Sequence, residues 1–339
     1  KLKKEIKVAQ FSGYVSEHSC YHHGENSLHK AIVGMGQDFI GSNNINLLHP
    51  AGTFGSRRMG GKDHASARYI FTKNAELLRI IYPSEDEPIL EHIDDENEIV
   101  EPHVYYPIIP MILVNGTSGI GTGYSSTIPS YNPKDLISNI RLYLEKHHKY
   151  DDTKMLSKFK ELMPWYKGFS GKIEKIDDYT FKTYGCFESV NENQIRITEL
   201  PIGKWTQDYI DHLVSLISND TLITDYKSSG GVYKINILIT FKNNILQALI
   251  KSDSLLNELK LVTTLKTSNM HLCNTTTDSS GSKIIKIHKF DNANEILINY
   301  IRIRYEAYVK RKKYYILVLE NDLNVLEYRK KFIEYLCSR

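Results

Sequence analysis

The pattern of apolar and polar residues changes twice along the chain of 339 residues. Up to about residue 135, short apolar groups alternate with turn residues, and eight of the ten prolines lie there. Apolar residues at intervals of three and four predict amphipathic helices, which we expect at residues 28–35, 75–81 and 134–147. Residues 1–10 alternate Lys with Ile and Val, and this period of two favours a strand.

Between about residues 165 and 290, apolar and polar residues alternate as in strands that have one face in water. The expected strands are 171–176, 179–184, 194–198 and 232–239, and helical spacing predicts helices at 206–217 and 244–259. Strands with one wet face are typical of antiparallel sheets. The pattern therefore indicates an α+β second domain with an antiparallel sheet.

The last segment, 291–339, contains neither proline nor glycine. Because these two residues interrupt helices, we expect one helix, about 70 Å long at 1.5 Å per residue. Its apolar residues follow an imperfect heptad, and so long a helix needs a partner or a coiled coil. The chain begins and ends within such patterns, so we expect a piece of a longer protein.

Composition excludes a wholly disordered chain, because 41% of the residues are hydrophobic. The apolar runs are far shorter than the roughly 20 residues that span a bilayer, and the four cysteines form no CxxC pair that would indicate zinc. The net charge of +3 is unevenly distributed, with +4 in residues 1–69 and −9 in residues 74–101. The basic segment could meet a polyanion, or both segments could be solvated faces of a neutral protein.

Residues 60–69 contain a candidate nucleophile, because Arg68 stands beside Tyr69 after a glycine pair. A tyrosine hydroxyl has a pKa of about 10 and is a poor nucleophile unless its transition state is stabilised. An adjacent guanidinium can supply that stabilisation by holding phosphate oxygens. The alternative is an ordinary surface dipeptide, since the chain has 23 tyrosines.

Two further segments could contact a phosphate or a base. The adjacent His22 and His23 cannot both face one metal on a helix or strand; one could donate to a phosphate, or both could pack or cap. The glycine-rich loop 115–123 fits neither nucleotide-binding fingerprint. Its isolated apolar residue, Ile120, could be a wedge between bases or a core residue of a turn.

Taken in order and spacing, a series of segments resembles the breakage–reunion core of eukaryotic-type (type IIA) DNA topoisomerase II. The segments are KVAQ (7–10), YHHGE (21–25), GSNNINLL (41–48), FGSR (54–57), GGKD (60–63), ARYIFT (67–72), PIIPM (107–111), NGTSGIGTG (115–123), ELP (199–201), WTQ (205–207) and LITDY (222–226). The resemblance covers nearly the whole chain and is most specific from residue 5 to residue 130. The YHHGE segment is similar to the eukaryotic and large-virus version and lacks the extra residue that the bacterial gyrase version has between the histidines.

The resemblance implies three parts. Residues 1–145 would be a winged-helix DNA-cleavage domain, residues 146–285 a tower domain, and residues 286–339 the start of the coiled-coil arm that leads to the exit gate.

The resemblance also implies roles for individual residues. Tyr69 would be the nucleophile that becomes linked to a DNA 5′ end, and Arg68 would stabilise the transition state. Ile120 would be the intercalating wedge that bends the cut duplex. His23 would contact the scissile region, with Tyr21 and His22 helping to place the DNA. From their charge and neighbourhood, three more residues are expected to face phosphates: Arg57, Arg58 and Lys62.

The implied activity is that of an ATP-dependent type II topoisomerase, which cuts one duplex, passes a second through the break and religates the first, so that DNA is relaxed or decatenated. Its cofactors would be Mg²⁺, held by a Toprim domain, and ATP, held by an ATPase domain; we find neither domain in this sequence and no metal site, and expect the fragment alone to cleave poorly. The expected partners are double-stranded DNA and a second copy of the chain, with no membrane. The expected location is the nucleus, or a cytoplasmic viral factory for a large DNA virus.

Two other interpretations are compatible with the residues themselves. One is a non-catalytic module that binds and bends DNA, suggested by the basic stretch and Ile120. The other is a coiled-coil assembly protein, suggested by the C-terminal helix.

Overall fold

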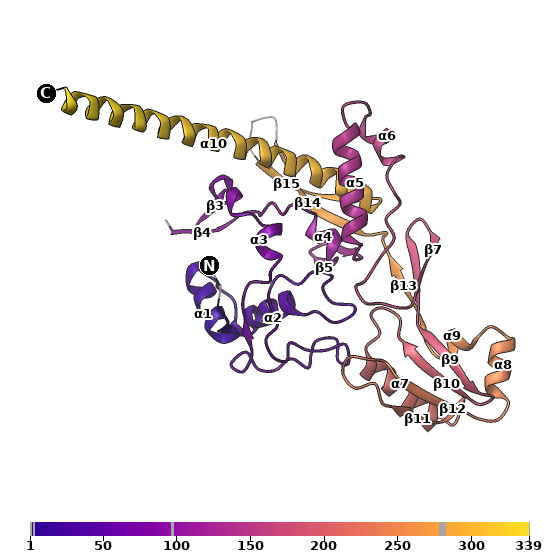
Figure 1. Ribbon diagram of the computed structural model, residues 1–339. Helices are drawn as coiled ribbons and strands as arrows, with labels where there is room; N and C mark the ends of the chain where they lie inside the picture. Colours follow the sequence, from indigo (N-terminus) through magenta and orange to yellow (C-terminus); the bar gives the residue numbers. More distant parts are fainter. Residues whose placement is uncertain (1, 3, 96–97, 278–282, 339) are drawn as a thin grey trace.

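The computed structural model describes residues 2, 4–95, 98–277 and 283–338 (Figure 1). Helices and small sheets are mixed along the chain, and all strand pairs among the described residues are antiparallel. The expected α+β class with antiparallel sheets is confirmed.

The first unit is built around helices α1 (Val8–His18) and α2 (Glu25–Gly36). Strands β1 (Ile6–Lys7) and β2 (Phe71–Thr72) pair beside them. The buried residues of this unit are Val8, Leu28, Ile32, Val33, Leu48, Phe54, Ala67 and Ile70. The strand expected over residues 1–10 is mostly wrong, because the backbone N–H groups at the start of α1 find acceptors in segment 67–70 and the helix begins at once.

A second group of elements follows. They are α3 (Leu78–Ile81), the 3₁₀ helix η1 (Ser84–Ile89), β3 (His92–Asp95), β4 (Glu98–Pro102), α4 (Met111–Val114), β5 (Thr117–Gly121), β6 (Tyr124–Ile128), α5 (Pro133–Lys146) and α6 (Asp152–Leu156). The helix expected at 134–147 is confirmed as α5, which begins where the Asn132 side chain accepts from Lys134 N at 3.0 Å. Of the helix expected at 75–81, only the last turn forms.

The third group contains the sheets of the middle of the chain. Strands β7 (Lys172–Asp177), β8 (Thr180–Tyr184) and β13 (Val262–Lys266) form one sheet, and β9 (Cys186–Asn191), β10 (Gln194–Glu199), β11 (Ile223–Ser228) and β12 (Ile237–Phe241) form another in the order β11-β12-β10-β9. Helices α7 (Thr206–Ser218), α8 (Ile245–Lys251) and α9 (Leu255–Glu258) accompany the second sheet, and β14 (Met270–Thr277) and β15 (Lys283–Phe290) form a hairpin. The apolar face of β10 and β12 buries Ile195, Ile197, Ile237 and Ile239 against α7.

Two expectations in this region need correction. The helix expected at 244–259 is broken into α8 and α9, because Asp253 adopts a left-handed backbone conformation with φ of 53°. The strand expected at 232–239 starts only at Ile237. The residues before it form a turn in which Ser229 N donates to Asn236 O at 3.0 Å.

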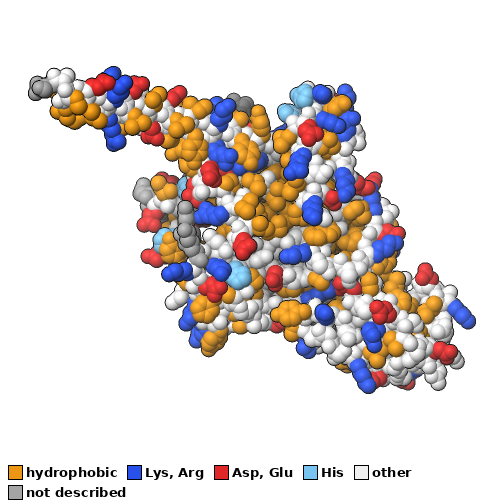
Figure 2. Space-filling view, viewed as in Figure 1, with side chains coloured by type: hydrophobic (Ala, Val, Ile, Leu, Met, Phe, Trp, Pro, Cys, Tyr) orange, Lys and Arg blue, Asp and Glu red, His pale blue; other side chains and the backbone are white. Residues whose placement is uncertain are grey.

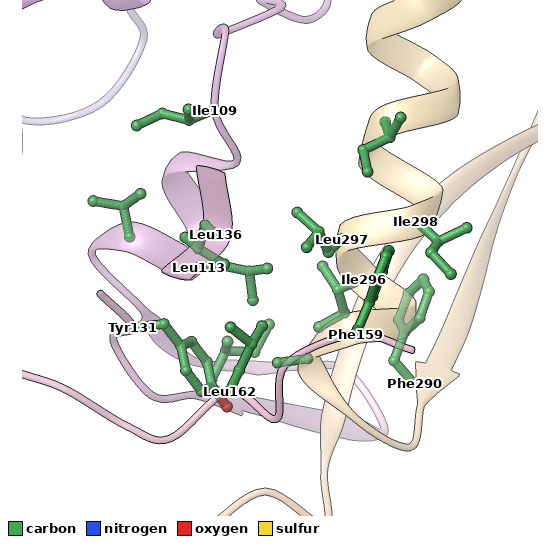
Figure 3. Packing of buried hydrophobic residues seen from close by; sticks show 14 of the residues in the cluster. Ile109, Leu113, Tyr131, Leu136, Phe159, Leu162, Phe290, Ile296, Leu297 and Ile298 are labelled. Carbon is green, nitrogen blue, oxygen red and sulfur yellow. The ribbon is translucent and has the colours of Figure 1, made fainter. Parts of the chain in front are cut away.

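Helix α10 (Ala293–Cys337) confirms the expected long C-terminal helix. Its first turns enter a buried cluster with α4 and α5, in which Leu113, Leu136 and Leu297 lie together (Figure 3). Beyond Ala307 the helix projects from the body, and apolar side chains continue along it toward the C-terminus (Figures 1 and 2). None of the helices within the described residues is both long and apolar enough to cross a membrane.

Part of the acidic segment 74–101 packs against this helix. Asp86, buried in η1, pairs with Arg304 at 2.6 Å and with Arg311 at 3.1 Å. The ring of Tyr308 lies 3.9 Å from the Arg304 guanidinium carbon and 4.8 Å from that of Arg311. The Asp86 carboxylate is therefore buried in a contact with α10 and does not face solvent.

Candidate active site

Arg68 and Tyr69 lie on a turn that is fixed at both ends. The side chains of Ala67 and Ile70 are buried in the first unit. Their carbonyls accept from the first N–H groups of α1, with Val8 N donating to Ile70 O at 3.0 Å and Ala9 N to Ala67 O at 3.1 Å. These bonds satisfy donors that a helix N-terminus otherwise leaves unpaired. The turn is therefore held by the start of α1.

This anchoring leaves the two candidate catalytic side chains outside. Tyr69 is 71% exposed, and Arg68 is exposed beside it. A phenol hydroxyl and a guanidinium that are adjacent on a fixed, exposed turn can both reach one phosphate group on a macromolecule. A small substrate would normally require a concave pocket around these groups; three pockets, lined by residues of α5, of segment 44–77 and of the region between α6 and α10, do not include Arg68 or Tyr69.

Tyr21, His22 and His23 lie immediately before α2. Tyr21 is half-buried and packs on the same apolar cluster as Ala67 and Ile70. Its ring meets that of His23 edge-on, with centroids 5.5 Å apart. His22 and His23 are exposed. The structure thus places this segment and the Arg68–Tyr69 turn on one packed unit.

Arg57 departs from the expected surface position. Its side chain is only 4% exposed and forms an ion pair with the buried Glu199. It also donates to Leu200 O at 2.8 Å. We therefore correct the expectation that Arg57 faces a phosphate: its guanidinium is committed to the end of β10.

Arg58 and Lys62 are exposed, as expected for residues that could meet phosphates. Their loop is fastened to the N-terminus of α7, where Gln207 N donates to Arg58 O at 2.9 Å. Gly60 adopts φ of 62°, and a Cβ at this position would overlap the indole of Trp205. The loop therefore needs glycine here to approach α7 closely.

Ile120 lies on the hairpin of β5 and β6 and is 94% exposed. The alternative that it is a core residue is thus excluded. The hairpin belongs to a different packing unit from Tyr69, since its end at Ile128 enters the cluster of α4 and α5. An apolar side chain left almost fully in water at the tip of a ribbon is available to a partner.

The sequence interpretation missed the residues that join these two units. Buried Asn44 donates to Val114 O at 2.8 Å and to Trp165 O at 3.1 Å, and it accepts from Lys167 N at 2.8 Å. Asn115 exchanges two hydrogen bonds with the backbone of Ile45. The only signal was their position inside the motif segments 41–48 and 115–123, where no role was assigned to either.

The described residues contain no cluster of three or more His, Cys, Asp or Glu side chains that could hold a metal ion. Lys and Arg side chains are spread among acidic and apolar ones over the face shown in Figure 2, not gathered in one patch.

The site thus combines an exposed tyrosine beside an exposed arginine with a hairpin that holds one apolar side chain in water, and comparison with known proteins supplies the family. Residues 1–337 match the family of the A subunit of DNA gyrase/topoisomerase IV. The chain belongs to this family of type II DNA topoisomerases.

Relatives and a solved structure show the same kinship. The chain is 44% identical to DNA topoisomerase 2 of Pisum sativum and 42% identical to that of Plasmodium falciparum, with 98% of the chain covered in each case. It spans only 22% and 23% of the length of these relatives. The crystal structure of the Plasmodium falciparum topoisomerase II DNA-binding, cleavage and re-ligation domain has a TM-score of 0.85 and 43% identity, covering 95% of this chain and 42% of that one.

Proposed function

We propose that this chain is the DNA-breaking and rejoining part of an ATP-dependent type II DNA topoisomerase, with Tyr69 as nucleophile. The observation that carries the proposal is the exposed Arg68–Tyr69 turn, pinned to the start of α1 in a chain of this family. Double-stranded DNA fits such a turn, because its phosphates approach the surface of a protein without entering a pocket.

The chemistry that we propose is an exchange of esters. The Tyr69 oxygen attacks a backbone phosphorus, the new phosphotyrosyl bond forms, and the bond to the DNA 3′ oxygen breaks. The phenol loses its proton and the leaving oxygen gains one. Since one phosphodiester replaces another, the reverse attack by the 3′ hydroxyl rejoins the strand without an energy source. Arg68 would hold the phosphate oxygens as charge develops on them.

Other groups complete the proposal. The described residues contain no cluster of three or more His, Cys, Asp or Glu side chains; the resemblance assigns Mg²⁺ and ATP to other parts of the whole protein, and we derive no step through them. A homodimer would bring two Tyr69 residues to opposite strands, and ATP use would accompany passage of the second duplex. The proposed location is the nucleus, or a viral factory in the cytoplasm if the source is a large DNA virus.

We also propose the finer division of the fold into a winged-helix part (1–145), a tower (146–285) and the beginning of a coiled-coil arm (286–339). The division is supported by the change from short helices to sheets and then to α10. DNA contacts are proposed for Tyr21, His22, His23, Arg58, Lys62 and Ile120.

Arg68→Ala in the full-length protein should slow DNA cleavage by about 100-fold or more while leaving DNA affinity within a few fold, because Arg68 acts on charge that develops only in the transition state. The measurement is single-turnover cleavage of a labelled duplex, with affinity determined separately. Equal loss of rate and affinity would make Arg68 a simple binding residue.

A second candidate function, bending of DNA without cleavage, is favoured by the exposure of Ile120. Only the first function, cleavage, produces a covalent adduct between protein and DNA. Detection of that adduct therefore distinguishes the two functions.

Ile120→Ala should reduce the bend that the full-length protein imposes on a duplex, because the methyl group of alanine is too short to insert between two stacked bases. Energy transfer between dyes on the duplex ends measures the bend. Folding stability should change by no more than about 0.5 kcal/mol, since the side chain is exposed. An unaltered bend would remove the wedge role.

A further inference from the structure

The hairpin of β5 and β6 cannot fix the position of Ile120 on its own. Each strand has five residues, and an isolated two-stranded ribbon is marginally stable in water. Gly119 and Gly121 flank Ile120, and glycine leaves the backbone more freedom than any other residue. A side chain that must force two stacked bases apart needs a rigid support, because any motion of the support is an ordering cost on binding.

A turn and a strand from a distant part of the chain supply that support. Ser125 lies directly opposite Ile120 in the hairpin. Asn269 Nδ2 donates to Ser125 Oγ at 2.9 Å, and His271 Nδ1 lies 2.9 Å from Ser125 O. The neighbouring Thr127 N donates to Asn269 O at 3.4 Å. The backbone carbonyl and the hydroxyl of Ser125 are thus held from outside the hairpin.

The direction of the histidine bond follows from its partners. His271 Nδ1 also lies 3.1 Å from Asn269 O, and both neighbours are carbonyl oxygens, which only accept. The nitrogen therefore carries the proton and donates to them. The ring of Tyr124 lies against the same histidine, with centroids 6.0 Å apart. His271 is in this way oriented by Asn269 and packed against the hairpin that it holds.

The support is itself anchored in the core. Met270, between the two residues, is fully buried in the cluster of α4 and α5 together with Phe290, its partner on β15. The turn containing Asn269 also connects β13 to β14, which lies beside β6. The hairpin is therefore tied to the body of the molecule at the residue opposite Ile120.

We propose that Asn269 and His271 are positioning residues that hold the wedge Ile120 in the orientation needed to bend DNA. We call these two residues and the bonds they make to Ser125 the Ser125 clasp. The proposal rests on the wedge role of Ile120 proposed above. Neither residue would touch the bases; both would act through Ser125. Their loss should leave Ile120 present and exposed but poorly oriented.

The test compares duplex bending by the full-length protein and its variants, with energy transfer between dyes on the two DNA ends. Asn269→Ala combined with His271→Ala should shift the equilibrium from bent to unbent duplex by roughly tenfold, the scale of a pair of net hydrogen bonds. His271→Asn should restore most of the bend relative to His271→Ala, because an Asn side-chain amide places an N–H donor near the position of Nδ1. His103→Ala is the control, since this exposed histidine follows β4, outside the hairpin and the strands that hold it, and should leave the bend unchanged.

The outcomes separate the two proposals. Loss of the bend in Ile120→Ala but a wild-type bend in the double clasp variant would overturn the clasp and leave the wedge intact. A wild-type bend in Ile120→Ala would overturn both. If the double variant fails to fold, as judged by circular dichroism and thermal unfolding, the single histidine variants decide: the clasp is also overturned if His271→Asn bends DNA no better than a folded His271→Ala.

Discussion

In the full-length protein, Tyr69→Phe is expected to abolish the covalent adduct between protein and DNA. The substitution removes one oxygen, which is the only atom of this side chain that can form an ester with a phosphate. Because the side chain is 71% exposed and the turn is held by backbone bonds of Ala67 and Ile70, folding stability should stay within about 0.5 kcal/mol of the wild type. Adducts trapped with denaturant on end-labelled DNA should fall to background.

The matched control is Tyr233→Phe. Tyr233 is 87% exposed and lies in the turn between β11 and β12, away from the first unit. This variant should form the adduct at the wild-type level, and both variants should bind DNA with wild-type affinity. Adducts that persist in Tyr69→Phe, or a nucleotide-bearing peptide that contains another tyrosine, would remove Tyr69 from its role.

The parts of the fold that the sequence predicted well are those in which one face meets the core and the other meets water. Helix α7 was expected at 206–217 and spans Thr206–Ser218, because its apolar residues repeat at helical spacing and pack on one sheet. The errors lie where the backbone conformation of a single residue ends an element. The break at Asp253 depends on a left-handed residue within a continuous helical pattern, and no periodicity indicates it.

The candidate site shows the same division. Adjacent positions such as Arg57 and Arg58 carry the same side chain, and their local sequence contains nothing that separates them. Their burial differs because Arg57 forms an ion pair with a buried carboxylate, Glu199, on a distant strand, whereas Arg58 is exposed at the surface. The distribution of charge along the chain therefore indicates a basic segment at residues 1–69, but it does not tell which of its positive side chains is available to DNA. Contacts between distant segments decide that.

Arg57→Ala is expected to destabilise the protein by about 3–5 kcal/mol, because it leaves the Glu199 carboxylate buried without its cation. Among the described residues, the donors that remain to Glu199 are neutral and include Ser170 Oγ at 3.0 Å and Leu200 N at 2.8 Å. The measurement is urea unfolding followed by circular dichroism. Replacing both partners, with Arg57→Ala and Glu199→Gln together, should cost less than the sum of the two single changes, because no unpaired charge remains buried.

The neighbouring Arg58→Ala separates the structural role from a role in DNA binding. Its side chain is exposed, so unfolding should change by no more than about 0.5 kcal/mol. If Arg58 meets a phosphate, the dependence of DNA affinity on salt should instead weaken by about one counterion. The opposite result, in which Arg57→Ala leaves stability intact and weakens the salt dependence, would return Arg57 to the DNA surface. Otherwise, the ion pair of Arg57 with Glu199 joins the loop of Arg58 and Lys62 to the end of β10, and the stability of the fold depends on it.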